Sequence, residues 1–327
     1  MKVLIAGGKE RYQKLFPDFA KDLPVELVFC ARDASPEEMA AACPDAGALL
    51  VDAITPVSAQ AMDLLPQVKL IHSEGVAYSA IDTAAAKERG IYVCNNAGCN
   101  AAPVAELAIM LMLMLTRLAL SAHRAVREGR QIQFKENIMQ EGGLELGELS
   151  VGLVGFGDIG QAAARRLKPF GCPLYYYAPH RRPEALEEEL GASYLPLEEL
   201  AARCDVVMLA CSVNESTKGM VNRDFLARMK SGAFLINTSR GELIDNLALR
   251  EALLEGKIAG AGLDTIAPEP TPADHPLVDL PEHVRDRVIC TAHLGGITEG
   301  AFRRAHTNIW NNVRLILEGK RPVHVVN

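Results

Sequence analysis

The chain has 327 residues, of which 49% are hydrophobic and 23% carry a charge. This composition is typical of a folded globular protein and excludes a disordered one, and the length predicts about two domains, each with its own core. A formal net charge of −7 supplies no basic surface of the kind that binds nucleic acid, so we expect no nucleic-acid partner.

Two features bear on membranes and on the cellular compartment. The first apolar run, at residues 3–6, is too short for a signal sequence, and we predict a core strand there. The longest apolar run, at 107–115, is too short to span a bilayer and lies between Glu106 and Arg117. We therefore predict a buried helix at an interdomain or subunit interface, and no membrane association. The eight cysteines form no CxxC pair, which is typical of reduced thiols in a cytoplasmic protein.

Short apolar segments alternate with helical patterns along both halves of the chain. Strands that alternate with helices form parallel sheets with helices on both faces, so we predict an α/β fold with two doubly wound parallel-sheet units. In the first half we predict strands at 3–6, 26–30, 48–52, 69–73 and 91–95, and helices at 36–43 and 80–89. In the second half we predict strands at 151–154, 174–178, 206–210, 233–237, 259–264 and 288–290, and helices at 197–203 and 246–254.

A long helix is predicted between the two units. It begins near Asn100, a suitable N-cap with Pro103 tolerated in the first turn, and is expected to run to about Glu128. An irregular loop is predicted to follow at 129–147.

A second long helix, predicted at 299–317, returns at the end of the chain. This return indicates that the C-terminus completes the first unit. We therefore predict a discontinuous substrate domain at 1–99 and 298–327, a dinucleotide-binding domain at 100–297, and a ligand cleft between them.

Residues 151–160 read VGLVGFGDIG, an apolar strand that runs into G-x-G-x-x-G and then a predicted helix at 161–167. In this motif we expect Gly155 to make the tight turn, Gly157 to let a pyrophosphate approach the backbone, and Gly160 to let the helix pack on the strand. The helix N-terminus offers unpaired N–H groups and a positive dipole end to the phosphates. The chain is therefore predicted to bind NAD or NADP.

Three side chains follow predicted strands of the second half, where the ligand sites of such folds concentrate. Arg240 comes after the strand AFLIN, and its planar fork of donors suits a carboxylate, although a solvated surface arginine is the alternative. Glu269 lies between two prolines that would hold its side chain in place. His293 follows the strand VIC, where a structural histidine and a catalytic one both remain open.

The remaining histidines suggest no chemistry. We expect them at the surface or in loops, at His123, His275, His283, His306 and His324. Cys290, His293, His283 and His275 are conceivable zinc ligands, but their spacing matches no zinc pattern. We therefore expect no metal site.

Six segments together resemble the D-isomer-specific 2-hydroxyacid dehydrogenases, a family that includes phosphoglycerate, D-lactate, glyoxylate/hydroxypyruvate and phosphite dehydrogenases. The combination is specific, whereas no single segment would be, and it covers essentially the whole chain. The resemblance implies a flavodoxin-like substrate domain, a Rossmann nucleotide-binding domain and a cleft between them. The segments are GVAYSAID at 75–82, NNAGCNAAPVAE at 95–106, VGLVGFGDIG at 151–160, NTSRGELID at 237–245, AGAGLDTIAPEP at 259–270 and TAHLGGIT at 291–298.

The family's catalytic arginine, glutamate and histidine fall on Arg240, Glu269 and His293 of this chain. The resemblance implies that Arg240 clamps the carboxylate and carbonyl oxygen of a 2-keto acid, which fixes its geometry. Protonated His293 would donate to that oxygen during reduction and act as base in the reverse direction. Glu269 would orient the imidazole ring and, as an adjacent anion, favour its protonated form.

The resemblance also places the backbone N–H groups of Val76 and Ala77 on the substrate carboxylate. Family members usually carry glycine at the position of Ala77, so we expect this loop to be somewhat tighter or shifted. The resemblance further implies a homodimer, packed through the apolar helix at 103–120.

The choice between NAD and NADP depends on the end of the second strand of the fingerprint unit. An NAD-selective site needs an acidic residue there, about 20 residues beyond the fingerprint, to bind the ribose 2′-hydroxyl. Ala178 takes that position, and His180, Arg181 and Arg182 follow. Because arginine binds a 2′-phosphate well, we predict a preference for NADP over NAD. The alternative is that both arginines are solvated and the site does not discriminate.

Other candidates for cofactor contact lie in the fingerprint and in the loops after second-half strands. They are Asp158, Ile159, Cys211, Thr217, Thr238, Ser239, Asp264, Gly295 and Gly296.

These features predict a cytoplasmic NAD(P)-dependent oxidoreductase that transfers a hydride between a nicotinamide cofactor and a small 2-hydroxy or 2-keto acid. Two alternatives stay open. A relative acting on phosphite or formate would share the arginine clamp, and activity on each substrate would separate them. A nucleotide-sensing module of the corepressor type would share the fold and bind the cofactor tightly without turning over any 2-keto acid.

Overall fold

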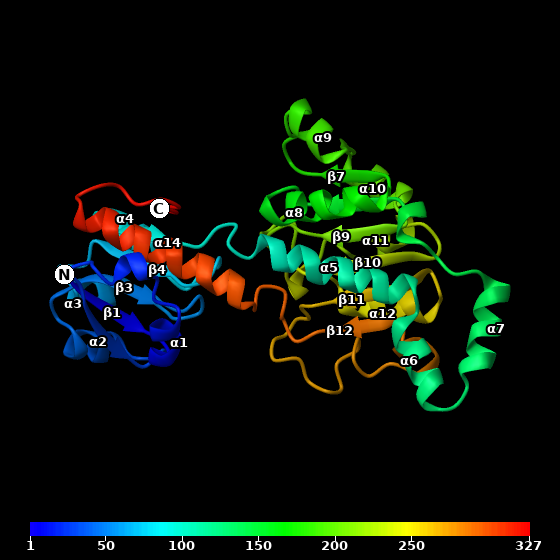
Figure 1. Cartoon of the computed structure of the whole chain (residues 1–327), viewed down its shortest axis with the longest axis horizontal. Coiled ribbons are helices and arrows are strands. Elements are labelled where there is room, and N and C mark those ends of the chain that lie inside the picture. Colours follow the sequence, from blue (N-terminus) through cyan, green and yellow to red (C-terminus); the bar gives the residue numbers. More distant parts are fainter. The chain divides into compact units, whose positions relative to one another are not determined.

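The computed structural model describes all 327 residues and contains two compact units. The first unit comprises Met1–Asn100 and Thr298–Asn327, and the second comprises Ala101–Ile297. Figure 1 shows their elements in chain order, with the last helix (red) among the blue elements of the first unit.

The first unit contains a five-stranded parallel sheet in the order β2-β1-β3-β4-β5. This is the flavodoxin-like order, in which the chain reverses its direction of winding beside the first strand. The strands are apolar and almost fully buried, as strands covered on both faces must be. They are β1 (Lys2–Ala6), β2 (Glu26–Cys30), β3 (Ala46–Val51), β4 (Leu70–Ser73) and β5 (Tyr92–Cys94).

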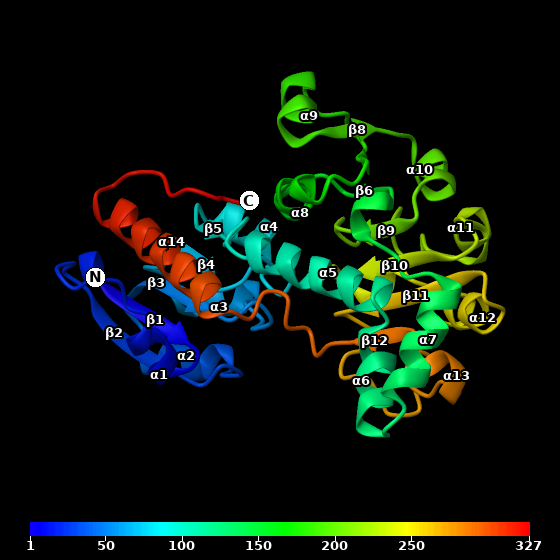
Figure 2. The same cartoon turned by 45° about the vertical axis from the view of Figure 1, so that its right-hand side comes forward.

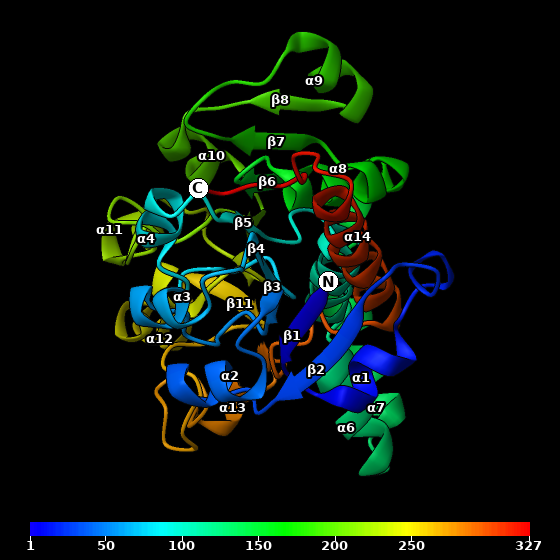
Figure 3. The ribbon, with the colours of Figure 1, turned by 90° about the vertical axis from the view of Figure 1, so that its left-hand side faces the viewer.

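Helices cover both faces of this sheet (Figure 3). One core cluster joins Met39 of α2 and Met62 of α3 to the sheet, and the other joins Tyr12 of α1 and Trp310 of α14 to the opposite face. Thr298 caps α14 by accepting a hydrogen bond from the Ala301 amide. The helices are α1 (Lys9–Lys14), η1 (Asp18–Ala20), α2 (Pro36–Ala42), α3 (Ala59–Leu64), α4 (Thr83–Glu88) and α14 (Glu299–Leu317).

The second unit contains a seven-stranded parallel sheet in the order β12-β11-β10-β9-β6-β7-β8. Strand β6 lies where the winding direction reverses, which is the ligand-binding position of a Rossmann fold. The strands are β6 (Val151–Val154), β7 (Leu174–Tyr177), β8 (Ala192–Tyr194), β9 (Val206–Leu209), β10 (Ala233–Asn237), β11 (Ile258–Leu263) and β12 (Val288–Cys290). The two sheets confirm the predicted α/β class with two doubly wound units.

Two core clusters lie on the two faces of the larger sheet. Helices α5 and α8 pack on one face, and α10, α11 and α12 pack on the other (Figure 2). The helices are α5 (Ala101–Thr116), α6 (Ala119–Arg127), α7 (Gln131–Glu141), α8 (Asp158–Leu167), α9 (Glu184–Leu190), α10 (Leu197–Arg203), α11 (Arg223–Arg228), α12 (Asn246–Leu254) and α13 (Glu282–Arg285). Short 3-10 turns are η2 (Leu146–Glu148), η3 (Lys168–Phe170) and η4 (Gly241–Leu243).

Two local predictions were wrong. The helix expected over 100–128 is broken, because Leu118 adopts a left-handed conformation with φ of 50° between α5 and α6. The loop expected at 129–147 contains helix α7. No residue of α7 is buried, so it has no continuous apolar face to contrast with a polar one, and the pattern that signals an amphipathic helix is missing.

No single helix is long and apolar enough to cross a membrane. Helices α5 and α6 together reach that length and composition, but they meet at an angle of 58°. Most of the side chains of α5 are buried in the core of the second unit, as in the core helix of a folded domain.

Candidate active site

The fingerprint glycines hold the turn between β6 and α8 in a close-packed arrangement. Gly155 has a φ of 106°, and a side chain there would collide with the backbone of Ala210. A Cβ on Gly160 would collide with the Gly155 carbonyl oxygen, so glycine lets the helix approach the strand. Sequence analysis expected α8 to begin at Gln161, but it begins at Asp158, directly after Gly157.

This turn has room and polar groups for a dinucleotide. A Cβ on Gly157 would have no atom within 4 Å, so space is open above the backbone at that point. The amides of Asp158 and Ile159 open the helix and have no acceptor within it. Thr238, at the end of β10, is 6% exposed, and its hydroxyl has no partner within the chain. An open glycine turn and an unpaired buried hydroxyl both fit a bound NAD(P).

Arg181, at the end of β7, is already engaged by a neighbouring carboxylate. Its guanidinium donates two hydrogen bonds to Glu187, of 2.9 and 2.8 Å. Glu187 also accepts a hydrogen bond of 2.7 Å from the Tyr176 hydroxyl. These bonds hold the pKa of the Glu187 carboxyl below its usual value, so Arg181 faces an anion rather than solvent. Ala178, where an NAD-selective acid was expected, is buried.

Arg182 lies against the fingerprint turn itself. Its Nε donates to the Phe156 carbonyl over 3.2 Å, and its backbone amide donates to the Tyr176 hydroxyl over 2.7 Å. Nη1 and Nη2 of Arg182 have no acceptor in the chain. His180 is exposed beside it.

His293 and Glu269 form a hydrogen-bonded pair in the second unit. Nδ1 of His293 lies 2.9 Å from Oε2 of Glu269, and the two side chains are 44% and 46% exposed. Because Nδ1 is held by the carboxylate, Nε2 is the ring nitrogen left to face a ligand. His293 has a φ of 55°, which is uncommon for a residue other than glycine. The backbone around it must therefore be held by other contacts.

Asp264 provides those contacts. Its Oδ1 accepts from the Thr291 hydroxyl over 2.6 Å and from the Leu294 amide over 2.8 Å, and its Oδ2 accepts from the Gly295 amide over 2.8 Å. The Asp264 carbonyl accepts from the His293 amide over 2.9 Å. Sequence analysis named Asp264 as a cofactor contact, whereas both of its carboxylate oxygens are occupied by the segment that carries the histidine.

Arg240 is exposed, and its Nη1 donates to the Ser239 carbonyl over 2.8 Å. No hydrogen bond joins it to Glu269 or His293. The next residue, Gly241, packs against the backbone of Ile266 and Ala267, and a side chain there would collide with it. This contact fixes the start of the arginine segment beside the turn that carries Glu269.

Other cofactor candidates bind within their own loops. The Ser239 hydroxyl donates to the Cys211 carbonyl, and the Thr217 hydroxyl donates to the Ser212 carbonyl over 2.8 Å. Gly295 is buried and Gly296 half-buried beside the histidine segment.

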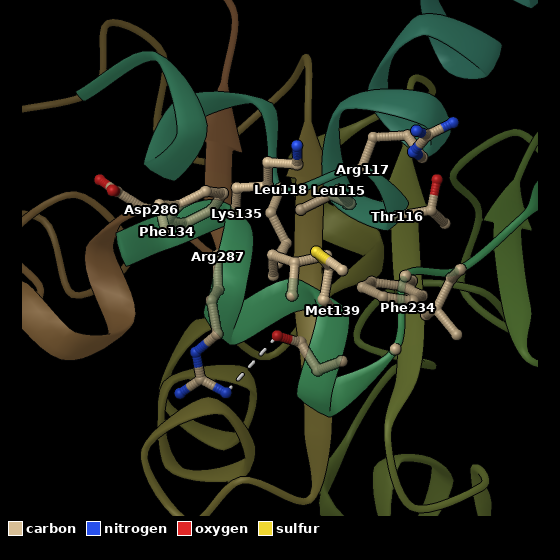
Figure 4. A pocket seen from close by; sticks show the side chains of 15 residues that line it. Leu115, Thr116, Arg117, Leu118, Phe134, Lys135, Met139, Phe234, Asp286 and Arg287 are labelled. Atoms are coloured by element: carbon tan, nitrogen blue, oxygen red, sulfur yellow. Dashed lines mark hydrogen bonds between the residues drawn. The ribbon is translucent and has the colours of Figure 1, made fainter. Parts of the chain in front are cut away.

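A cavity of about 500 Å³ opens beside the histidine–glutamate pair. Asp264, Glu269 and His293 line it together with Cys290 and Thr291. A second cavity of about 470 Å³ lies under α7 and contains none of the predicted site residues (Figure 4). Mainly apolar side chains such as Phe134, Met139 and Phe234 line the second cavity.

In the first unit, the loop after β4 presents two free amides. The carbonyl oxygens of Gly75, Val76 and Ala77 accept from the Asn96 amide, the Asn95 side chain and the Ser73 hydroxyl, over 3.0, 2.8 and 2.6 Å. The N–H groups of Val76 and Ala77 have no acceptor in the chain. A loop whose carbonyls are paired and whose amides are free offers only donors to a ligand, which suits an anion.

Ala77 fits this loop without strain. Sequence analysis expected a tighter or shifted loop because glycine is usual there, but Ala77 does not have a left-handed φ. The close approach occurs at Gly75, where a Cβ would meet Cβ of Ala53 at 2.7 Å.

Two histidines expected at the surface are buried instead. His275 accepts a hydrogen bond from the Leu277 amide over 3.2 Å, and His306 is fully buried beside Glu74. His306 could have been found from its place on the apolar side of the amphipathic α14, whereas nothing in the sequence marks Glu74. No group of three or more His, Cys, Asp or Glu side chains is placed to hold a metal ion.

Comparison with known proteins identifies the family. Residues 109–295 match the family model of the D-isomer specific 2-hydroxyacid dehydrogenase, NAD binding domain. The chain belongs to this family. Glyoxylate reductase of Korarchaeum cryptofilum is 36% identical over 284 residues, which cover 86% of this chain and 83% of that protein. The predicted family is thus confirmed, and with it NAD-dependent 2-hydroxyacid dehydrogenase chemistry on a small acid.

Two further family members extend the comparison. D-3-phosphoglycerate dehydrogenase of Mycobacterium bovis is 35% identical over 291 residues, 89% of this chain and 53% of that protein, so the chain spans about half its length. The crystal structure of a D-isomer specific 2-hydroxyacid dehydrogenase from Lactobacillus delbrueckii ssp. bulgaricus, in its NAD-complexed form, superposes with a TM-score of 0.85. It is 25% identical and covers 100% of both chains.

Proposed function

We propose that this dehydrogenase interconverts a small 2-keto acid and its 2-hydroxy acid, with His293 as the proton-transfer group. The observation that carries the proposal is the 2.9 Å contact between His293 Nδ1 and Glu269 Oε2. It leaves Nε2 as the proton donor toward a carbonyl oxygen during reduction, and as the acceptor from a hydroxyl in the reverse direction. Glu269 fixes the ring and stabilises its protonated form, because an adjacent anion favours imidazolium.

NAD(P), when bound, supplies or accepts the hydride. The second unit is the proposed cofactor domain. Its Gly157 turn, the first amides of α8 and the unpaired Thr238 hydroxyl are the groups proposed to hold it. Asp264 acts in this proposal on the protein, by fixing the segment around His293, since the Leu294 and Gly295 amides already occupy its carboxylate.

The substrate carboxylate is proposed to bind cationic and amide donors. Arg240 is the cation, since its exposed guanidinium makes only one hydrogen bond, to its neighbour's carbonyl. The free amides of Val76 and Ala77 are the donors from the first unit, which is the proposed substrate domain. A 2-keto acid needs both kinds of contact, because its carboxylate must be fixed before proton transfer to the adjacent oxygen is efficient.

We propose a preference for NADP(H), carried by Arg182. Arg181 is paired with Glu187, so only Arg182 has nitrogens free to bind a 2′-phosphate. Ala178 presents no carboxylate that would repel it. The NAD-complexed relative and the NAD-binding family model support nicotinamide dinucleotide binding in general and leave the selection to these residues.

A homodimer is proposed through α5. An apolar hollow on this helix remains at the surface, lined by Ile109, Met110 and Leu113 together with Phe170 of η3. Met110 is exposed although it lies on the most apolar helix of the chain. Sedimentation of the wild type and of Met110→Lys tests this interface, and a monomeric wild type at micromolar concentration would contradict it.

A panel of 2-keto acids, assayed with NADH and NADPH side by side, tests the proposed function. Glyoxylate, hydroxypyruvate, pyruvate and larger 2-keto acids are offered for reduction, and phosphite and formate for oxidation. The proposal predicts turnover of at least one 2-keto acid. Turnover of phosphite or formate alone, or tight cofactor binding without turnover of any compound, would contradict it.

A further inference from the structure

A buried carboxylate that the proposed chemistry does not use lies directly before the Val76–Ala77 loop. Glu74 follows β4, and its side chain is 4% exposed. Carboxylates are almost never buried this fully unless they are paired. Its partners therefore show what it does.

Glu74 binds two other segments of the first unit. Its Oε1 lies 2.9 Å from Nε2 of His306 on α14. Its Oε2 forms an ion pair with Arg11 of α1, and Arg11 also contacts Asp52 at 3.4 Å. Segments that are far apart in the sequence thus meet at one carboxylate.

Aromatic rings enclose these groups. The Tyr12 ring packs edge-on against His306 at 4.7 Å between centroids, and the Phe302 ring lies 5.7 Å from the Arg11 guanidinium carbon. His306 has no exposed surface at all. Loss of one partner from such a dry cluster would leave another charge unpaired, so the cluster tolerates few arrangements of its members.

The backbone of Glu74 is held as firmly as its side chain. Its amide donates to the Val51 carbonyl over 2.8 Å, and its carbonyl accepts from the Asn96 side chain over 2.9 Å. Asp52 and Ala53 follow Val51, and Gly75 packs against Ala53. Arg11 therefore joins the ends of two neighbouring strands, β3 and β4, at the point where the loop with the free amides begins.

We propose that Glu74, held by His306 and Arg11, is a positioning residue that orients the Val76 and Ala77 amides toward the substrate carboxylate. This proposal rests on the proposed function for the role of those amides. The Glu74 carboxylate touches no substrate. It fixes the start of the loop, and the pairing of Asn95, Asn96 and Ser73 with the loop's carbonyls fixes the rest.

Glu74→Gln tests the proposal, because glutamine keeps the size of the side chain but cannot hold the Arg11 cation. The KM of the best 2-keto acid is expected to rise about tenfold, as expected for the loss of one or two hydrogen bonds to a charged group. The Kd of NADPH should stay within twofold of the wild type. An unchanged KM would overturn the proposal.

Val313→Ala is the matched control for lost stability. Val313 is fully buried on α14 but forms no contact with the Glu74 cluster through hydrogen bonds or ion pairs. It should lower the melting temperature without raising the KM. If Val313→Ala raises the KM as much as Glu74→Gln does, general destabilisation explains both effects and the proposal fails.

Arg11→Met, added to Glu74→Gln, separates positioning from stability. Removing the unpaired cation should recover part of the lost melting temperature, while the KM stays high because the loop still lacks its anchor. Recovery of the KM in step with the melting temperature would overturn the proposal.

Hydrogen exchange gives a readout that does not depend on activity. The amides of Val76 and Ala77 should exchange about tenfold faster in Glu74→Gln than in Val313→Ala if the loop is released locally. If the wild type reduces no 2-keto acid, the proposed function fails while this measurement still decides on the role of Glu74. Equal exchange rates in the two variants would overturn that role.

Discussion

His293 Nδ1 lies 2.9 Å from Oε2 of Glu269, and this contact assigns different tasks to the two ring nitrogens. The nitrogen that faces the carboxylate is fixed, and the other is available for proton transfer. The left-handed backbone of His293, with φ of 55°, is held by Asp264 through the amides on either side of the histidine. The ring is therefore oriented by two carboxylates, one acting on the side chain and one on the backbone.

Glu269→Gln should move the pH optimum of 2-keto acid reduction downward. Reduction needs a protonated His293, and without the adjacent anion the imidazolium forms only at lower pH. The measurement is the pH profile of kcat/KM, with the exposed Glu282→Gln as a control that leaves the profile unchanged. An optimum that stays in place or moves upward would contradict the assigned role.

Arg240→Lys should reduce kcat/KM for the 2-keto acid by about tenfold or more, because a point charge does not reproduce the planar fork. Arg223→Lys, at an exposed ion pair with Glu251, should leave it unchanged. Steady-state kinetics with saturating cofactor measure both. Wild-type kcat and KM in Arg240→Lys would show that this arginine does not clamp the carboxylate.

The wild type should show a higher kcat/KM with NADPH than with NADH. Ala178→Asp should shift the ratio toward NADH, because a carboxylate at the end of β7 binds the ribose hydroxyls and repels a 2′-phosphate. Arg182→Gln should weaken NADPH about tenfold and leave NADH nearly unchanged. Melting temperatures check that the buried aspartate is tolerated. A wild type that favours NADH would refute the preference.

Burial lowers the pKa of His72 to about 4, against an ordinary value of 6.5. Its Nδ1 donates to the Ser73 carbonyl over 2.8 Å, and its Nε2 accepts from Asn312 over 3.1 Å, so the folded chain holds the neutral ring. The unfolded chain takes up a proton below pH 6.5, whereas the folded chain does so only near pH 4. The free energy of unfolding should therefore fall by up to about 3 kcal/mol across this range.

Urea unfolding at several pH values measures that slope. His72→Gln should flatten the slope between pH 6.5 and 4, whatever its effect at neutral pH. The exposed His123→Gln should keep the wild-type slope. The same slope in wild type and His72→Gln would show that another group causes the acid sensitivity.

The periodic parts of the sequence predicted the fold well, and its irregular parts did not. Strands such as 26–30 and 151–154 were predicted to the residue, because continuous apolar runs between polar turns leave few alternatives. The break at Leu118 follows from one backbone conformation, which no residue type there signals. Strand β8 (Ala192–Tyr194) was missed because it has only three residues and a polar centre.

The candidate site divides in the same way. The family motifs located Arg240, Glu269 and His293, and the structure brings the last two together. The pairing of Arg181 with Glu187 depends on the fold of the segment between them, and the Glu74 cluster joins residues up to 295 positions apart, from Arg11 to His306. Contacts of this kind become visible only once the packing is known.

The most direct test of the proposed chemistry is the single-turnover rate of 2-keto acid reduction in His293→Ala, measured beside the Kd of NADPH. Proton transfer by a positioned side chain contributes about 10²–10⁴-fold, so the rate should fall by that factor while cofactor binding stays within twofold of the wild type. A His293→Ala enzyme that reduces its best 2-keto acid at nearly the wild-type rate would contradict the assigned mechanism.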